Sequence, residues 1–356
     1  MDEQTERDVF WGNGQETPVR PQQKQVMTER PELYRDAAPT VSVIIPAYNA
    51  AKYIGDALKS VQDQTFTSHE IIVVNDGSPD TKEFERELEP FAKSVRYLKH
   101  ENRGAAAARN TGLNAARGEF VAFLDADDRW LPNFLEDQIN FLKANDADLV
   151  YSDALLVGES PLNGRTFMQV QPSRGAVTPE SLLAVNVTVL TSAVLARKTP
   201  ILNVGLFDAN IKRGHDFELW FRLAKAGARF AYHPKVLAHH RVVESGLSGD
   251  TISQLKRTLA VLERIKARKD LTPSEKSALQ LNLNRTLAEL ALENGKAKLL
   301  EGDFTGASES FTEAKRYRRN WKLTLVSLAV GIAPETLRRI YHRRSSSSKS
   351  AQRPAI

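Results

Sequence analysis

Short apolar runs alternate with amphipathic segments along residues 40–151 of the chain. Five runs rich in β-branched or aromatic side chains predict buried strands, at 41–45, 71–74, 95–98, 120–124 and 149–151. Between them, helical spacing or alanine-rich composition predicts helices, among them 81–93 and 104–116. Because strand and helix alternate about every 25 residues, we expect an α/β fold with a mostly parallel central sheet flanked by helices.

Polar clusters follow three of these strands, at the point where each strand ends. They occupy residues 46–49, 75–78 and 125–128. In a parallel sheet the carboxyl ends of the strands meet at one edge, and ligands bind outside that edge. The topology alone therefore predicts that the three clusters lie together.

Changes in composition divide the chain into four parts, at 1–38, 39–250, 251–320 and 321–356. Residues 1–38 are polar and lack periodicity, so we expect them to be mostly disordered. The α/β domain follows and extends to residue 250. Its second half is less regular, with one clear helix from about Phe217 to Ala226.

Residues 251–320 have a helical pattern. Within them, 288–314 resemble a single tetratricopeptide-like helical hairpin with a turn at Gly302-Asp303. One such hairpin cannot bury its own apolar face, so it must pack on the α/β domain or on a partner. The last part begins with mostly apolar residues, 321–332, and ends in a serine-rich stretch, 345–356, for which we expect disorder.

Composition removes several classes of chemistry and separates the tail from the rest. The 356 residues include no cysteine, which excludes disulfide scaffolds, cysteine-ligated zinc, iron–sulfur clusters and thiol catalysis. Residues 315–356 contain eleven Lys and Arg and one Glu, a net charge of +10. Since the whole chain carries +5, the remainder carries −5. A charged tail of this kind concerns partners rather than the fold.

Neither a transmembrane helix nor a secretory signal is predicted, and a cytoplasmic location follows by default. Residues 321–332 and the arginines after them suit an amphipathic segment on an anionic membrane surface, which would place the protein peripherally on the inner face. A core-packed helix with a solvated basic tail is the alternative. Nucleic acid is not expected as a partner, because few aromatic residues are interleaved with the basic ones.

The end of the first two strands carries the first candidate chemistry. The turn Pro46-Ala47-Tyr48-Asn49 lacks the pattern G-x-G-x-x-G, which argues against a dinucleotide-binding dehydrogenase. After the second strand, Asp76 is placed to accept hydrogen bonds from a base or a ribose. The alternative is that Asp76 and Gly77 only form a turn.

An aspartate cluster, Asp125-Ala126-Asp127-Asp128, follows the fourth strand. Alternation along an extended chain would place Asp125 and Asp127 on the same side. Two nearby carboxylates repel each other, and a divalent cation relieves the repulsion; hard oxygen ligands suit Mg²⁺ or Mn²⁺. The alternative is a solvated loop in which Asp128 caps the helix that begins near Pro132.

Two helix starts have both a chemical and a structural interpretation. Gly104 and the small residues after it would let a ligand approach a helix, and Arg109 would reach a base or a phosphate. An alanine-rich helix with solvated arginines is the alternative there. Asp216 is either a helix N-cap or a carboxylate that projects into a cleft and acts as a general base.

In combination and in this order, five motifs closely resemble family 2 glycosyltransferases with the GT-A fold. They are P-A-Y-N, I-I-V-V-N-D-G-S, N-R-G-x-x-x-A-R-N-x-G, F-L-D-A-D-D and H-D-F-E-L-W, within residues 40–250. The resemblance implies a Rossmann-like domain and transfer of a sugar from a nucleotide-activated donor, most often UDP-linked, with inversion at the anomeric carbon. It also implies a metal cofactor, Mg²⁺ or Mn²⁺.

The resemblance further implies a role for each matching residue. Asp127 would bind the metal, and Asp216 would be the catalytic base. The nucleotide-sugar would be bound by Pro46, Ala47, Tyr48, Asp76, Gly104, Arg109, Asp125 and Ala126. His215 stands where an acid often precedes the base, which leaves the partner of Asp216 open. Residues 239–241 lie where members carry a mobile loop; His240 is the candidate for a contact with metal or diphosphate, and solvent-facing loop histidines are the alternative.

The sequence constrains the acceptor and the class of activity less than it constrains the donor. The Q-x-x-R-W motif of processive polymer synthases is absent, which favours transfer of single sugars to a glycan or lipid-linked acceptor of the cell envelope. Transfer to polyprenyl phosphate is the alternative among enzymes, and it predicts a phosphate-binding basic cluster near the acceptor cleft. A catalytically silent nucleotide-sugar-binding or partner platform is the alternative outside enzymes; the intact Asp76, Asp127 and Asp216 argue against it.

Overall fold

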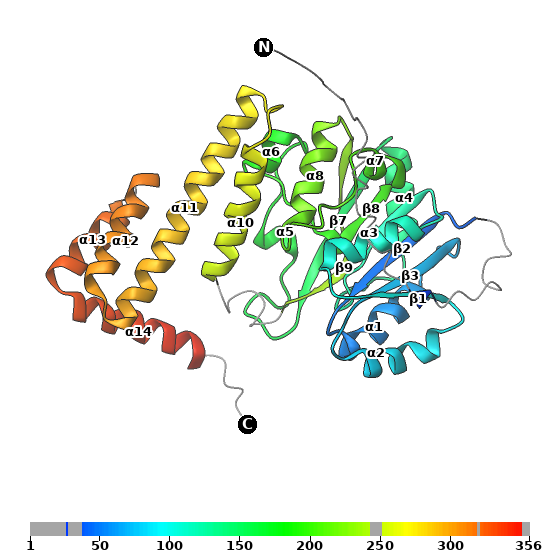
Figure 1. Cartoon of the computed structure of the whole chain (residues 1–356), viewed down its shortest axis with the longest axis horizontal. Helices are drawn as coiled ribbons and strands as arrows, with labels where there is room; N and C mark the ends of the chain where they lie inside the picture. The colour runs from blue at the N-terminus through cyan, green and yellow to red at the C-terminus, as the bar shows by residue number, and fades with distance from the viewer. Residues whose placement is uncertain (1–25, 28–37, 243–250, 319–320, 351–356) are drawn as a thin grey trace, which may run out of the picture.

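A computed structural model of the chain describes residues 26–27, 38–242, 251–318 and 321–350. An α/β body occupies one side of the molecule, and a set of longer helices extends from it on the other side (Figure 1). Within the described residues, the strands are β1 (Val26–Met27), β2 (Val41–Ala47), β3 (His69–Asp76), β4 (Val95–His100), β5 (Phe120–Phe123), β6 (Arg129–Trp130), β7 (Leu149–Val157), β8 (Val194–Arg197) and β9 (Phe230–Arg241).

These strands form a single sheet in the order β1-β4-β3-β2-β5-β8-β7-β9-β6. The block β4-β3-β2-β5 is parallel, as the alternation of strands and helices predicts. Beyond it, β8 runs antiparallel to both β5 and β7, while β9 is parallel to β7. The short edge strands β1 and β6 are antiparallel to their neighbours. The expected α/β architecture is confirmed, with antiparallel strands that the sequence does not predict.

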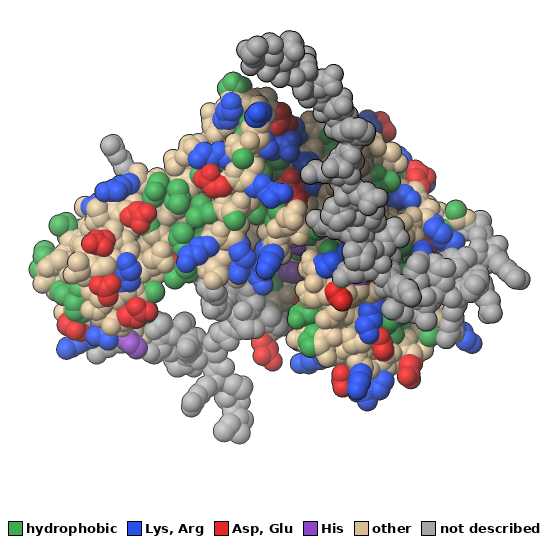
Figure 2. Space-filling view, in the orientation of Figure 1, with side chains coloured by type: hydrophobic (Ala, Val, Ile, Leu, Met, Phe, Trp, Pro, Cys, Tyr) green, Lys and Arg blue, Asp and Glu red, His purple; other side chains and the backbone are tan. Residues whose placement is uncertain are grey.

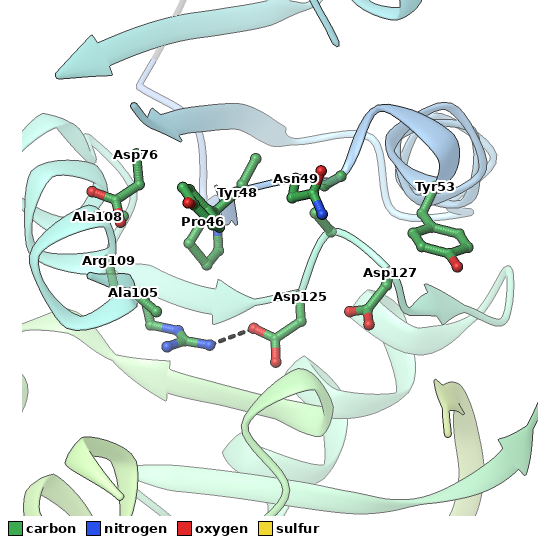
Figure 3. A pocket seen from close by; sticks show the side chains of 13 residues that line it. Pro46, Tyr48, Asn49, Tyr53, Asp76, Ala105, Ala108, Arg109, Asp125 and Asp127 are labelled. Carbon is green, nitrogen blue, oxygen red and sulfur yellow. Dashed lines mark hydrogen bonds and ion pairs between the residues drawn. The ribbon is translucent and has the colours of Figure 1, made fainter. Parts of the chain in front are cut away.

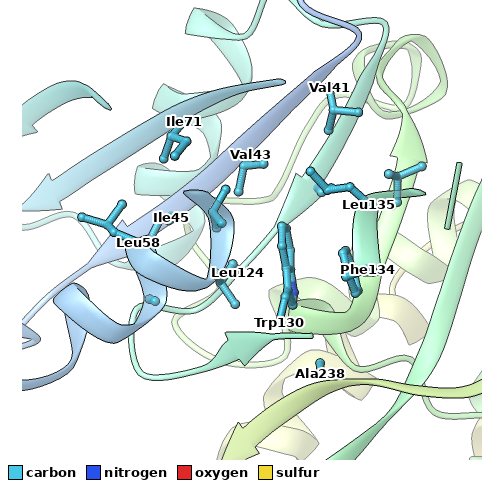
Figure 4. Close-up of a cluster of buried hydrophobic side chains, with 14 of the residues drawn as sticks. Val41, Val43, Ile45, Leu58, Ile71, Leu124, Trp130, Phe134, Leu135 and Ala238 are labelled. Atoms are coloured by element: carbon cyan, nitrogen blue, oxygen red, sulfur yellow. The ribbon is translucent and has the colours of Figure 1, made fainter. Parts of the chain in front are cut away.

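Helices cover both faces of the sheet, which explains why the central strands are apolar at successive positions. Val43 and Ile45 of β2 face α1, whereas Ile44 between them faces α3. Trp130 stacks on Phe134 with ring centroids 4.0 Å apart, and both belong to the buried cluster that contains Val43 and Ile45 (Figure 4). The helices of the body are α1 (Ala51–Gln62), α2 (Thr81–Leu88), α3 (Ala105–Ala115), α4 (Phe134–Ala144), α5 (Phe167–Val170), α6 (Pro179–Leu183), α7 (Lys198–Asn203) and α8 (His215–Lys225).

The helical extension packs directly on this body. Val261 and Leu262 of α10 and Leu279 of α11 share a buried cluster with Phe221 of α8. Lys225 of α8 donates to the buried carboxylate of Glu275, with Nζ and Oε2 2.8 Å apart. The helices are α10 (Thr251–Lys266), α11 (Pro273–Glu301), α12 (Phe304–Tyr317), α13 (Trp321–Ile332) and α14 (Pro334–Ser350).

The predicted helical hairpin is the pair α11 and α12, with its turn at Gly302-Asp303. Gly302 has φ +89, a left-handed conformation that glycine adopts readily, and Asp303 Oδ1 accepts a hydrogen bond from the Gly306 amide. The face of the hairpin is covered by α13 and α14, because Val330 is buried against Leu299 and Phe311. Residues of this chain therefore bury the apolar surface that one hairpin alone would expose.

The two ends of the chain differ in part from expectation. Val26–Met27 of the N-terminal segment forms a strand that pairs with β4, whereas 1–25 and 28–37 lie outside the described residues. The backbone of 345–350 is helical and belongs to α14, so the expected disorder there is wrong; 351–356 lie outside the described residues. None of the described helices is both long and apolar enough to span a membrane.

Replacing Gly295 by valine should destabilise the hairpin by about 1–3 kcal/mol. A Cβ atom at this position would lie 2.7 Å from the ring of Phe311, which is fully buried and cannot move aside easily. Chemical denaturation of both proteins measures the difference. Gly331→Ala on α13 is the matched control, because a Cβ there meets no atom within 4 Å. An equally stable Gly295→Val protein would contradict the packing described for α11 and α12.

Candidate active site

A cavity of about 270 Å³ opens at the carboxyl edge of the parallel strands. Its lining contains most of the residues that the sequence assigns to the nucleotide-sugar: Pro46, Ala47, Tyr48, Asp76, Arg109, Asp125 and Ala126, together with Asp127 (Figure 3). Gly104 is the exception; it lies just outside the lining, as the residue before α3, with φ +90. The three polar clusters at the strand ends do meet. We call this space the donor cavity.

Asp76 organises one wall of the donor cavity. It is buried, and its two carboxylate oxygens accept hydrogen bonds from the backbone amides of Arg103 and Gly104, each 2.8 Å long. His100 Nδ1 lies 3.3 Å from the same carboxylate. These bonds fix the turn that leads into α3, whose small residues Ala105 and Ala108 line the cavity. A helix start without bulky side chains is suited to an anionic ligand.

An exposed aromatic ring stands at the mouth of the donor cavity. The side chain of Tyr48 is 55% exposed, unusual for a residue that follows a fully buried strand. The next residue, Asn49, has φ +52, and its amide donates to Ser78 Oγ over 2.6 Å. This bond ties the turn after β2 to the turn after β3. The Tyr48 ring is thereby available to stack on a planar ligand such as a base.

Arg109 connects the donor cavity to α8. Its guanidinium is buried, pairs with Asp125 through Nη2, and has Nη1 2.7 Å from Nε2 of His215. Burial and the charge of Arg109 lower the pKa of His215, so the ring is neutral and accepts this hydrogen bond at Nε2. His215 is therefore a partner of Arg109 rather than of the neighbouring Asp216. Among the described residues, no hydrogen bond joins the His215 ring to Asp216.

Asp125 and Asp127 share the cavity but differ in pKa. Burial raises the pKa of Asp125, but the charge and hydrogen bond of Arg109, together with the charges of His240 and His215, outweigh burial and hold the pKa below its usual range. Burial raises the pKa of Asp127 to about 6, with further contributions from the charges of Asp128 and Asp125. The chain turns between them, since the Asp128 amide donates to the Asp125 carbonyl. Both carboxylates face one cavity through a turn rather than through extended alternation.

Asp128 has a different role from the one that the sequence suggests. It is buried and does not cap a helix, because α4 begins at Phe134 after Asn133. Its carboxylate accepts from the Arg241 amide over 2.8 Å and lies 2.9 Å from His240 Nδ1. Burial lowers the pKa of His240, but the bond to Asp128 and the surrounding carboxylates raise it to about 9. The pair ties the aspartate turn to β9.

His239 and His240 lie in β9, so the expectation of a mobile loop at 239–241 is wrong. His239 faces a separate cavity beside α1, together with Asp56 and Arg129. His240 is occupied at Nδ1 by Asp128, which leaves only Nε2 for any other contact. Arg241, which the sequence does not single out, lies over the ring of Tyr53 at 4.6 Å and donates to the Asp127 carbonyl. The positively charged guanidinium of Arg241 therefore lies beside the donor cavity.

Asp216 lines a second cavity, of about 490 Å³, between α8 and the helical extension. One carboxylate oxygen accepts from Thr191 Oγ1 over 3.0 Å, and the other accepts from the Phe217 amide over 2.9 Å. Ser192, which follows Thr191 in the chain, accepts a hydrogen bond from the amide of Asp125 at 3.1 Å. Residues 191–192 and 215–216 thus join the two cavities. We call the second one the Asp216 cleft.

The described residues do not by themselves present a complete metal site. No group of three or more His, Asp or Glu side chains is placed among them to hold a metal ion. Asp127 and Asp125 are nevertheless two carboxylates in one cavity, and the pKa of Asp127 is raised by burial first and then by the charges of Asp128 and Asp125. Mg²⁺ is commonly bound by one or two carboxylates and completed by substrate phosphates. The donor set fits a metal that binds together with a diphosphate.

Comparison with known proteins gives the following likenesses. The family described as "Glycosyl transferase family 2" matches residues 42–184. The chain is 32% identical over 224 residues to UDP-Glc:alpha-D-GlcNAc-diphosphoundecaprenol beta-1,3-glucosyltransferase WfgD of Escherichia coli. This alignment covers 62% of the chain and 85% of WfgD.

Solved structures resemble most of the chain. TarS 1–349 of S. aureus in complex with UDP-GlcNAc superposes with a TM-score of 0.55 at 20% identity, covering 87% of this chain and 92% of that one. The mannosyltransferase PcManGT of Pyrobaculum calidifontis, in complex with GDP-Man and Mn2+, gives a TM-score of 0.56 at 20% identity, covering 90% and 88%. At this level of identity the likeness establishes the fold.

Proposed function

The chain belongs to glycosyltransferase family 2, and on that premise we propose that it transfers a single sugar from a UDP-sugar to a hydroxyl of a glycan or lipid-linked acceptor. Its fold is of the GT-A type expected from the sequence, with a helical C-terminal region. The bound nucleotide-sugars of TarS and PcManGT carry different nucleotides, UDP and GDP. The choice of UDP rests on the match of Tyr48 and Asp76 to positions that hold uracil and ribose.

The arrangement of two adjoining cavities supports this proposal most directly. One holds the carboxylates and the aromatic ring suited to a nucleotide, and the other holds a single carboxylate, Asp216. Arg109 bonds both to Asp125 and to His215, the neighbour of Asp216. These bonds place the two cavities next to each other. A donor in the first cavity and an acceptor hydroxyl beside Asp216 would react in one displacement.

In the reaction, Asp216 accepts the proton of the acceptor hydroxyl as its oxygen attacks the anomeric carbon. The bond from that carbon to the diphosphate breaks, and the electron pair leaves with the nucleotide. Because the attack comes from the side opposite the leaving group, the configuration inverts and no covalent intermediate forms. Arg241, beside the carbonyl of Asp127, would stabilise the developing negative charge.

Mg²⁺ or Mn²⁺, when bound, supplies further positive charge at the diphosphate. Asp127 would hold the ion, with Asp125 beside it, while Asp128 remains committed to His240 and Arg241. His240, whose Nδ1 is paired with Asp128, could contact the ion only through Nε2, and a carboxylate on the other ring nitrogen is the usual arrangement for a metal-binding histidine. The Mn2+ in the structure of PcManGT supports a metal in this fold.

A panel of donors tests the proposal. The full chain is mixed with UDP-, GDP- and dTDP-sugars in the presence of Mn²⁺, and thermal stability and donor hydrolysis are measured. We expect one class of donor to raise the unfolding temperature, because a ligand that binds only the native state stabilises it. A catalytically silent platform would bind a donor without hydrolysing or transferring it. Failure of every donor to bind would contradict the proposal.

We further propose that the tail holds the enzyme against an anionic membrane surface from the cytoplasmic side. Leu325, Leu328 and Ile332 are 54%, 56% and 83% exposed, and their spacing places them on one face of α13. The end of the molecule that α13 occupies bears hydrophobic side chains beside acidic and basic ones (Figure 2). The net charge of +10 over 315–356 supplies the attraction to acidic lipids.

Replacing Leu325, Leu328 and Ile332 by glutamine should release the protein from phosphatidylglycerol vesicles while donor hydrolysis continues. Deletion of the tail is a poorer test, since it would uncover Leu299 and Phe311. Sedimentation with vesicles measures the binding. Leu281→Gln is the control, because Leu281 is 68% exposed on α11, away from this face. Unchanged sedimentation of the triple variant would contradict the proposal.

A further inference from the structure

The Asp216 cleft is built jointly by the catalytic body and the helical extension. Asp216, Phe217 and Trp220 come from α8, whereas Arg257 and Val261 come from α10. With a volume of about 490 Å³ it is larger than the donor cavity and is of the size that holds a small molecule. The helices after residue 250 therefore form part of the site in which the acceptor would bind.

The lining of the cleft is apolar over much of its surface. Leu182, Val187, Trp220 and Leu262 contribute to it and are themselves almost completely buried. Trp220 also has an indole N–H that is buried and lacks a hydrogen-bond partner. A free sugar, with a hydroxyl on nearly every carbon, would leave such a wall poorly contacted. An acceptor with an apolar portion would bury it.

Two arginines in the same lining have no acidic partner. The exposed Arg213 precedes α8 and Arg257 lies on α10, and neither takes part in the ion pairs found within the described residues. Nε of Arg257 is buried and has no hydrogen-bond partner. Most buried N–H groups in proteins are paired, since a lone one is unfavourable. Together with the exposed Arg213, Arg257 gives the cleft two guanidinium groups suited to a phosphate or diphosphate, which such groups can bind in bidentate fashion.

Asp216 shares this cleft, and its charge decides which end of the acceptor approaches it. A phosphate placed against the carboxylate would be repelled, whereas a hydroxyl can donate a hydrogen bond to it. The phosphate therefore belongs at the arginines and the hydroxyl at Asp216. This separation disfavours transfer to polyprenyl phosphate itself, in which a phosphate oxygen would be the nucleophile.

We propose that the Asp216 cleft binds a sugar carried on a lipid diphosphate, with Arg213 and Arg257 on the diphosphate and the apolar wall against the first part of the lipid. This assignment rests on the proposed function and names the acceptor class. The likeness to WfgD, whose name includes a diphosphoundecaprenol acceptor, agrees with it. The helix α10 then selects the acceptor and takes no part in donor chemistry.

Binding of farnesyl diphosphate tests the assignment without knowledge of the sugar. Its affinity for the full chain is measured by calorimetry with the donor cavity saturated by the nucleotide and Mn²⁺. Arg213→Gln and Arg257→Gln should each weaken binding roughly 10- to 100-fold, as expected for loss of a charge-assisted hydrogen bond. Arg257→Lys should recover part of the loss. Lys256→Gln, which removes the same charge from an exposed position on α10, should change nothing.

Two further ligands separate the phosphate from the lipid. Inorganic pyrophosphate and farnesol should each bind more weakly than farnesyl diphosphate, and only the phosphate-bearing ligands should respond to the arginine variants. Unchanged farnesyl diphosphate binding in both arginine variants would overturn the assignment, as would farnesol binding of equal strength. Donor hydrolysis by the native protein is the separate measure of the proposed function. Its absence would overturn that function, whereas hydrolysis without the arginine effect would overturn the acceptor class alone.

Discussion

Replacing Asp216 by asparagine should lower kcat for transfer by about 10²- to 10⁴-fold, the usual contribution of a positioned general base. Donor affinity should stay unchanged, because Asp216 lines the Asp216 cleft and is absent from the lining of the donor cavity. Asparagine has almost the same shape and can still accept the hydrogen bond from Thr191. The expected loss is therefore chemical rather than structural.

Steady-state kinetics together with donor titration measures both parts of this expectation. Asp208→Asn is a suitable control, since Asp208 pairs with Arg264 and lines neither the donor cavity nor the Asp216 cleft. It should retain nearly full transfer. A high kcat in Asp216→Asn would exclude Asp216 as the base. Weakened donor binding would mean that Asp216 contacts the nucleotide-sugar instead.

Replacing Asp127 by asparagine should abolish the stimulation of donor hydrolysis by Mn²⁺ and lower transfer about 10²- to 10³-fold, the range for loss of one electrostatic stabiliser. An amide is a poorer ligand for a hard cation than a carboxylate. The same change removes a carboxylate whose pKa is raised by burial and by the charges of Asp128 and Asp125, so the protein without metal should be no less stable. The variant should therefore lose activity that depends on the metal ion and should not lose stability.

The neighbouring aspartate provides the contrast. Asp128→Asn weakens the buried pairing with His240, so it should lower the unfolding temperature while the remaining activity still responds to Mn²⁺. Thermal denaturation and a Mn²⁺ titration of both variants separate the two roles. If Asp127→Asn and native protein show the same metal titration, the ion is bound elsewhere or is not required.

Several parts of the fold and site follow from sequence because they are local. The parallel strands are buried on both faces and read as continuous apolar runs, and the carboxyl ends of those strands bring Asp76, Asp125 and Asp127 together. Other strands could not be predicted. In β9, Pro234 and three histidines break the apolar pattern, and the pairing with β7 contains register shifts near Ser152 and Asp153. These features are specified by tertiary contacts.

The parts of the site that escaped prediction depend on distant segments. Thr191 reaches Asp216, and His215 reaches Arg109, across 25 and 106 residues of sequence. Arg257 lies beyond the region that resembles the family, yet it lines the Asp216 cleft. No spacing rule connects such residues, because the contacts form only after the sheet and the helical extension have packed. A basic residue without an acidic partner is a signal that only the structure reveals.

The pairing of β1 with β4 bears on how the protein behaves in solution. Without Val26–Met27, β4 would be the last strand on that side of the sheet, with a row of unpaired amide and carbonyl groups. Such a row is a template for pairing with another chain. Protein shortened to begin at residue 38 should therefore aggregate more readily than the full chain, which light scattering can measure. Two residues that line neither cavity would then keep the enzyme monodisperse.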